Sequence, residues 1–274
     1  MAEAAASHLN PLARDFLTRL PQAPVPGKQL HRTESGAVVG DWFGFELSSA
    51  FQPIVDAANG AVVGREAFLR SHDPDEHGLS PWTLFSAAAE DARLIALDRL
   101  ARTVHLLNAL AAGNDVPLFL NVHGRLLAAV GDDHGRAFRR VVDALGVQPD
   151  SIVIETPPEA SAQPDLLAFV LRNYRANGFR VAVNVESAAQ WQTIANTVWP
   201  QFVKVDRRKL GSGVEAHERL KWLAALREDA RIIVTHVEEP APELAADHVL
   251  LQGYAYGHPV GATAFAQEQQ TGNG

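Results

Sequence analysis

Seven short apolar runs in this sequence each carry, at or near their last residue, a polar or charged side chain that could do chemistry. These side chains belong to Glu66 and Arg70, Asn121, Glu155, Asn184, Lys204 with Asp206, Thr235 with Glu238, and Gln252. Carboxylate and amide oxygens bind hard divalent cations, and Arg and Lys bind phosphate groups. One polar residue at a strand end is ordinary in a solvated loop, but its repetition in successive runs predicts a cup that binds a metal ion or an anion.

The apolar runs have the length of β-strands, and longer helical patterns lie between them. The strand-like runs span residues 50–55, 61–69, 116–122, 151–155, 180–185, 202–205, 231–235 and 249–252. The turn signal Ala58-Asn59-Gly60 separates the first two runs and predicts an antiparallel hairpin. The patterns typical of helices span residues 80–91, 94–112, 136–145, 164–177, 188–196, 215–229 and 242–246.

Repeated strand–helix units favour parallel pairing and an α/β fold. Eight strands between residues 50 and 252 predict a closed (β/α)8 TIM-like barrel that starts with an antiparallel strand or hairpin. An open, doubly wound sheet is the alternative. In such a barrel the C-terminal ends of the strands meet at one mouth, where the polar side chains would form the cup.

The composition excludes several classes of protein. The chain has 274 residues, no cysteine, a formal net charge of −8 and 47% hydrophobic residues. A chain this apolar can bury a core, so disorder is not expected. The lack of cysteine excludes disulfides and Cys-ligated metal sites. The negative net charge argues against a nucleic-acid polymer as a partner.

The two ends of the chain differ from the middle. Residues 1–36 are expected to form an N-terminal extension or linker with one short helix between Leu9 and Leu20. The barrel domain would span residues 37–266, and residues 267–274 would be a flexible tail. The sequence shows neither a secretory signal nor the roughly 20 apolar residues of a membrane span, so a cytoplasmic protein is expected.

Seven short motifs follow one another between about residues 45 and 260. They are Phe51-Gln52-Pro53-Ile54-Val55-Asp56, Gly64-Arg65-Glu66-Ala67-Phe68-Leu69-Arg70, Leu97-Asp98, Leu120-Asn121-Val122-His123-Gly124-Arg125, Ile152-Val153-Ile154-Glu155, Val203-Lys204-Val205-Asp206 and Gln252-Gly253-Tyr254. This ordered set resembles the motifs of EAL domains, which bind and often hydrolyse the bacterial messenger cyclic di-GMP. The resemblance implies a barrel of the EAL type with the nucleotide at its mouth.

In active members of that family, two divalent ions, usually magnesium or manganese, share a cluster of carboxylates and activate the attacking water. The resemblance implies these remnant metal ligands: Glu66, Asn121 and Glu155. It also implies that Lys204 would lie near the water or the phosphate. Neutral residues stand where the family carries three carboxylates: Asn184, Val185 and Thr235. Each lost charge beside two dications removes kilocalories of attraction, so Glu66 and Lys204 are not expected to form a competent catalytic site, and the metal positions are expected to be empty.

Nucleotide binding does not require those carboxylates. The resemblance assigns seven positions to the ligand: Gln52, Leu69, Arg70, Asp98, Asn121, Glu238 and Gln252. Arg70 can donate a fork of hydrogen bonds to a phosphate. The first hypothesis is therefore a catalytically degenerate cyclic di-GMP receptor that needs no cofactor and acts on a protein partner in bacterial signalling.

Two other hypotheses stay open. One is a nucleotide-independent protein-interaction module, and the other is a cyclic di-GMP phosphodiesterase that requires magnesium or manganese. The resemblance also allows a homodimer. At the level of residues, structural roles compete with ligand binding, because Asp98 could pair with Arg102 on the same helix and Lys204 with Asp206 at the surface.

Overall fold

Eight strands close into a barrel in the computed structural model, which describes residues 9–73, 78–88, 90–129, 135–197, 199–211, 213–226 and 229–272. The barrel strands are β3 (Phe45–Asp56), β4 (Val62–His72), β6 (Leu118–Asn121), β7 (Ile152–Thr156), β8 (Arg180–Val185), β9 (Phe202–Asp206), β10 (Arg231–Thr235) and β11 (Val249–Leu251). Around the ring their order is β3, β11, β10, β9, β8, β7, β6 and β4, and β4 pairs again with β3. The closed barrel predicted from the sequence is confirmed, and the open sheet is wrong.

Strand β3 is antiparallel to both of its neighbours, β4 and β11. The other neighbouring pairs of the ring are parallel. The turn between β3 and β4 is stabilised locally, since Ala58 N donates to Asp56 Oδ1 at 2.9 Å and Ala61 N donates to Asn59 Oδ1 at 2.8 Å. These bonds, with Gly60 at a φ of +72°, account for the antiparallel hairpin predicted at this place.

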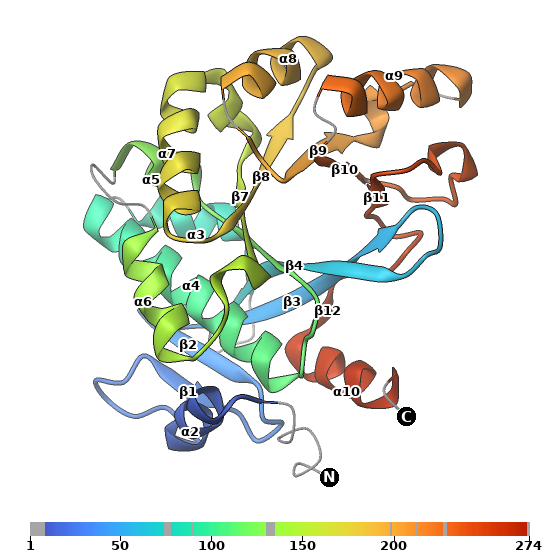
Figure 1. The fold of residues 1–274 in the computed structure, drawn as a ribbon. Helices are drawn as coiled ribbons and strands as arrows, with labels where there is room; N and C mark the ends of the chain where they lie inside the picture. The colour runs from blue at the N-terminus through green and yellow to red at the C-terminus, as the bar shows by residue number, and fades with distance from the viewer. Residues whose placement is uncertain are drawn as a thin grey trace.

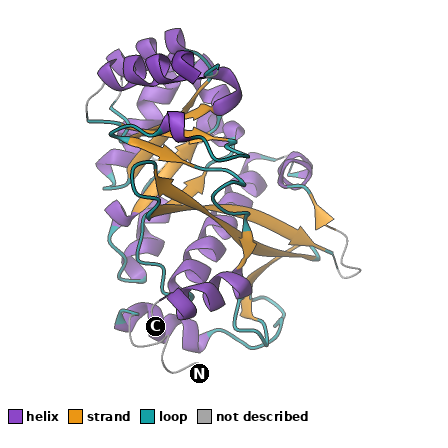
Figure 2. Cartoon of the chain, turned by 90° about the vertical axis from the view of Figure 1, so that its right-hand side faces the viewer, coloured by secondary structure: helices purple, strands orange, loops and turns teal. Residues whose placement is uncertain are grey.

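Helices cover the outside of the barrel (Figures 1 and 2). They are α3 (Pro81–Ala87), α4 (Asp91–Ala111), α5 (Gly124–Ala129), α6 (Arg136–Ala144), α7 (Pro164–Ala176), α8 (Ala188–Thr197) and α9 (Gly213–Leu226). Helix α5 was not expected. The pattern at residues 242–246 gives only the 3-10 turn η4 (Pro242–Leu244), which is too short to cover a strand. Three further 3-10 turns are η1 (Pro149–Ser151), η2 (Pro158–Ala162) and η3 (Arg207–Lys209).

The inside of the barrel has an apolar layer below a polar one. Seven strands each give one residue to the apolar layer: Ile54, Phe119, Val153, Ala182, Phe202, Ile233 and Leu250. On β4 the matching position is Gly64, where a Cβ atom would lie 2.8 Å from the Phe119 ring. Side chains two residues apart face the same way, and two residues nearer the mouth stand Gln52, Glu66, Asn121, Glu155, Asn184, Lys204, Thr235 and Gln252. A closed apolar plug therefore underlies the polar layer.

The segments outside the barrel pack against it. They comprise α2 (Pro11–Arg19), β1 (Leu30–Arg32), β2 (Val38–Trp42), β5 (Gly78–Leu79), β12 (Val260–Gly261) and α10 (Ala262–Gly272). Figure 1 shows α2, β1 and α10 at the same end of the molecule. Leu17 of α2 is buried in the main core, and β1 and β2 extend the barrel sheet at β3.

The predicted division at residues 36 and 266 stays a prediction, although α10 continues through residue 272, into the segment expected to be a tail. Residues 1–8 and 273–274 lie outside the described part of the chain. In that described part, no helix has the length and hydropathy that a bilayer crossing requires.

Candidate functional site at the barrel mouth

The polar layer forms the floor of a cavity of about 430 Å³ at the C-terminal ends of the strands. Seven floor residues line it: Gln52, Glu66, Glu155, Asn184, Lys204, Thr235 and Gln252. Its rim comes from the loops that follow the strands, through Phe68, Arg70, His236, Glu238, Gly253, Tyr254 and Pro259. The strand ends thus meet where the sequence predicts a cup.

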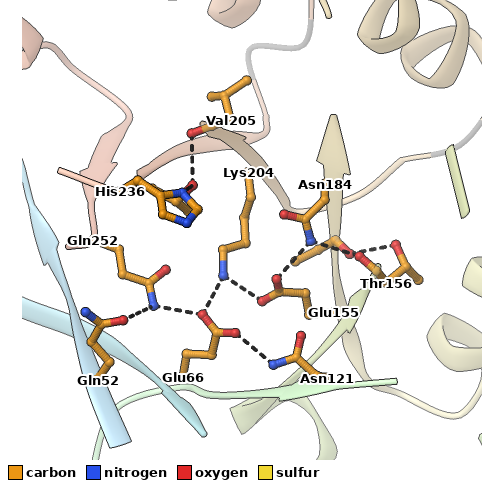
Figure 3. A network of polar contacts seen from close by, with 12 residues as sticks. Gln52, Glu66, Asn121, Glu155, Thr156, Asn184, Lys204, Val205, His236 and Gln252 are labelled. Carbon is orange, nitrogen blue, oxygen red and sulfur yellow. Dashed lines mark hydrogen bonds and ion pairs between the residues drawn. The ribbon is translucent and has the colours of Figure 1, made fainter. Parts of the chain in front are cut away.

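Lys204 lies at the centre of this floor (Figure 3). Its Nζ is 2.7 Å from Glu66 Oε2 and 2.8 Å from Glu155 Oε2, and its side chain is only 3% exposed. The alternative pairing with Asp206 is wrong, because Asp206 lies outside the cavity wall and pairs with Arg208 at 2.5 Å. One buried cation therefore bridges the two carboxylates.

Amide side chains satisfy the remaining carboxylate oxygens. Asn121 Nδ2 donates to Glu66 Oε1 at 2.7 Å, and Asn184 Nδ2 donates to Glu155 Oε1 at 2.8 Å. Gln252 Nε2 donates to Glu66 Oε2 at 2.7 Å and to Gln52 Oε1 at 3.2 Å. The floor is thus a single network in which both oxygens of each carboxylate already accept a hydrogen bond (Figure 3).

The network shifts the pKa values of the two carboxylates in opposite directions. Burial alone would raise the pKa of Glu66, but the charge of Lys204 and the hydrogen bonds from Lys204, Asn121 and Gln252 outweigh it and lower the pKa. The pKa of Glu155 is raised, because burial and the negative charge of Glu66 outweigh Lys204 and Asn184. Burial would lower the pKa of Lys204, yet the two carboxylates raise it. The ammonium group consequently keeps its charge at neutral pH.

The rim carries groups suited to a ligand with rings and negative charge. Arg70 is exposed, with its guanidinium 5.9 Å from the centre of the Phe68 ring, and its Nη1 donates to the carbonyl of Leu69 at 3.0 Å. Tyr254 is exposed and stacks on the imidazole of His258, with ring centres 4.1 Å apart. Aromatic faces and an exposed guanidinium can stack on bases and bind phosphate oxygens.

Besides Asp206, four of the residues that the sequence placed at the mouth or the ligand do not line the cavity. Asp98 is buried on α4 and forms an ion pair with Arg102, as the structural alternative predicted; burial outweighs that partner and raises the pKa of Asp98. Leu69 and Val185 are buried in the core. Asn121 acts on the floor through its bond to Glu66.

Five further residues line the cavity without having been expected at the ligand: Phe68, His236, Gly253, Tyr254 and Pro259. Tyr254 and Gly253 follow Gln252 directly in a quoted motif, and that adjacency was a usable signal. Pro259 lies within no motif. Its place at the rim follows from the path of the chain after β11.

Residues 44–259 match the family model described as the EAL domain. The chain belongs to the EAL-domain family. The matched range agrees with the span of about residues 45 to 260 over which the motifs were found in sequence. No sequence among curated proteins matches this EAL domain.

Solved EAL structures share its fold. The FimX EAL domain from Pseudomonas aeruginosa, bound to c-di-GMP, is 22% identical with a TM-score of 0.64, over 80% of this chain and 92% of that chain. A standalone versatile EAL protein from Vibrio cholerae O395, in a c-di-GMP-bound form, is 20% identical with a TM-score of 0.63, over 80% and 94%. BlrP1 from Klebsiella pneumoniae, in a manganese/cy-diGMP complex, is 22% identical with a TM-score of 0.63, over 88% and 59%.

Some similar chains are considerably longer. The EAL enzyme Bd1971, in a form with cAMP and cyclic-di-GMP bound, is 20% identical with a TM-score of 0.65. The match covers 83% of this chain but only 65% of the Bd1971 chain. At these identities the likeness shows a common fold.

Proposed function

We propose that this EAL domain is a cyclic di-GMP receptor that binds the dinucleotide without hydrolysing it. The observation that carries the proposal is the pairing of Lys204 with both Glu66 and Glu155 on the floor of the cavity. This pairing leaves a polar, ligand-sized cavity but occupies the carboxylates that a catalytic metal centre would use. The c-di-GMP-bound forms of the FimX and Vibrio cholerae structures support the choice of ligand.

The residues at the floor do not suit a pair of divalent ions. Two dications close together need a dense set of negative oxygens. Here each carboxylate gives one oxygen to Lys204 and the other to an asparagine. Asn184 and Thr235 line the same cavity without adding charge. Within the described residues, no group of three or more His, Cys, Asp or Glu side chains is placed to hold a metal.

Ligand binding would use the rim and the amides of the floor. We assign the phosphate contact to Arg70, whose guanidinium is exposed and has no carboxylate partner among the described residues. Gln52, Asn121, Glu238 and Gln252 would supply the remaining polar contacts. Leu69 and Asp98 would support the wall from behind, because both are buried. Occupancy would change a contact with a protein partner in the cytoplasm.

The test is isothermal titration calorimetry of cyclic di-GMP into the purified protein, with magnesium, with calcium and with EDTA. The receptor predicts micromolar or tighter binding that survives EDTA, and no loss of the dinucleotide during incubation with magnesium or manganese. Turnover that stops on Glu66→Ala would establish the phosphodiesterase instead. Absence of binding heat in every condition would leave the nucleotide-independent interaction module.

Arg70→Ala should weaken cyclic di-GMP at least about tenfold, because it removes a charge-assisted donor from the rim. The fold should survive, since the side chain is exposed. Calorimetry gives the affinity, and thermal unfolding checks the fold. Arg172→Ala, an exposed arginine on α7 that does not line the cavity, is the matched control and should bind like the unmodified protein. Equal affinities for the two variants would contradict the role of Arg70.

A further inference from the structure

His236 has an unusual backbone conformation at the rim of the cavity. Its φ is +57°, in the left-handed region that side chains with a Cβ atom rarely adopt. Such strain persists only where the surrounding structure enforces it, and it concentrates at binding sites. His248 shares the conformation, with a φ of +66°, but it stands just before β11, at the end of the strand away from the mouth. Comparing variants of His236 and His248 therefore separates the effect of the backbone conformation on ligand binding from the effect of a position at the mouth.

The left-handed turn directs the imidazole of His236 into the cavity, whose wall it helps to form. The side chain is 53% exposed, and its Nδ1 lies 3.2 Å from Thr235 Oγ1 and 3.5 Å from Asp206 Oδ2. In Figure 3 the other ring nitrogen is turned toward the side where the Gln252 amide and the Lys204 ammonium lie. Nδ1 therefore has protein partners, whereas no described residue is hydrogen-bonded to Nε2, which is open to a ligand.

The charges around the cavity show why a further donor matters. The wall contains three carboxylates, those of Glu66, Glu155 and Glu238, against the two cations Arg70 and Lys204. Lys204 is already shared by two of these carboxylates. A cyclic dinucleotide brings two phosphate charges into this negative surrounding. Among the described residues of the wall, Arg70 is the one cation without a carboxylate partner, so a further donor would favour binding.

We infer that His236 is a phosphate-binding residue of this site, with Nε2 donating to a phosphate oxygen of the bound dinucleotide. The inference rests on the proposed function, because it names a further contact in the same cavity. Thr235 Oγ1, 3.2 Å from Nδ1, can donate to that nitrogen, which leaves the ring proton on Nε2 for the phosphate. Asp206 Oδ2 lies 3.5 Å from Nδ1 and is itself paired with Arg208. Glu238, two residues further along the chain, is the remaining carboxylate of the cavity wall.

His236→Gly is the informative variant, because glycine adopts a positive φ without penalty and the fold should be retained. We expect cyclic di-GMP to bind at least about tenfold more weakly, as a charge-assisted hydrogen bond is lost. His248→Gly makes the same chemical change and the same relief of strain away from the mouth, and it should bind like the unmodified protein. Thermal unfolding of both variants verifies folding.

His236→Asn supplies a second test, since asparagine tolerates the left-handed conformation and keeps a donor. Its affinity should lie between those of His236→Gly and the unmodified protein, and the difference between the unmodified protein and His236→Gly should shrink at high salt. Unchanged affinity in His236→Gly would overturn the inference and leave the receptor standing. Equal, salt-independent losses in both His236 variants would also overturn it. If the unmodified protein binds no cyclic di-GMP, the proposed function itself fails.

Discussion

Lys204 places a positive charge between two carboxylates, and all three side chains are almost fully buried. Each charge alone would pay a large desolvation cost, which the close contacts with Glu66 and Glu155 offset. The asparagines and Gln252 then occupy the remaining carboxylate oxygens. At the scale of residues, the floor of the cavity is a hydrogen-bonded network in which a cation lies between the two carboxylates.

Lys204→Met should lower the free energy of unfolding by about 3–5 kcal/mol, because it leaves two carboxylates buried beside each other without a cation. Urea unfolding followed by circular dichroism measures this loss. Lys209→Met is the matched control, since Lys209 pairs with Glu186 at 2.9 Å on the surface and should contribute no more than about 1 kcal/mol. Comparable losses in the two variants would show that the Lys204 network is not buried in solution.

At the scale of elements, the cavity rim depends on a close approach between the segment after β11 and the loop after β10. Val237 N donates to the carbonyl of Gln252 at 3.2 Å, and Ala255 N donates to the carbonyl of Val237 at 3.0 Å. Gly253 sits between these bonds, and a Cβ atom there would lie 2.1 Å from the Val237 carbonyl oxygen. The atoms that such a Cβ would meet belong to the backbone of Val237, so no flexible side chain can move aside to make room for it.

Gly253→Ala should therefore destabilise the protein by about 1–3 kcal/mol and weaken cyclic di-GMP binding, because the two loops must separate at the rim. Thermal unfolding and calorimetry measure the two effects. Gly261→Ala is the control, since nothing lies within 4 Å of the added atom. The close approach would be refuted if both alanine variants unfolded at the same temperature as the unmodified protein.

For the molecule as a whole, the N-terminal segment behaves as part of the folded unit. Leu17 is only 4% exposed and belongs to the same core cluster as the residues under α4. Strand β1 pairs with β2, which in turn pairs with β3, and Asp41 N donates to the carbonyl of Gln29 at 2.8 Å. A segment held by both apolar packing and backbone hydrogen bonds should unfold together with the barrel.

Leu17→Ala should lower the free energy of unfolding by about 2–3 kcal/mol in a single transition, because it opens a cavity in the shared core. Tryptophan fluorescence and circular dichroism should report the same midpoint. Leu12→Ala, on the same helix but with 55% of the residue exposed, should change stability by less than about 0.5 kcal/mol. Two separate transitions, with only the first affected by Leu17→Ala, would show that the segment folds independently.

Much of the fold follows from local patterns. Short apolar runs, the Ala58-Asn59-Gly60 turn and the helical periodicity between runs predicted all eight barrel strands and the antiparallel start. The sequence also placed Glu66, Glu155, Lys204 and Gln252 at one mouth, because parallel strands end on the same side of a barrel. The helix predicted at residues 242–246 is only a 3-10 turn over residues 242–244, since a short segment has too few residues for periodicity to decide its type.

The sequence by itself determined which residue types point into the barrel at its mouth, because side chains alternate between the inside and the outside along each strand. Only the tertiary structure decided which of them meet. Lys204 lies 138 residues from Glu66 and 49 from Glu155, so their pairing depends on closure of the barrel. Asp98 turned to Arg102 rather than to the cavity, and His236 acquired its left-handed turn at the rim. Contacts between distant residues and a strained backbone are set by packing in three dimensions, which no local pattern records.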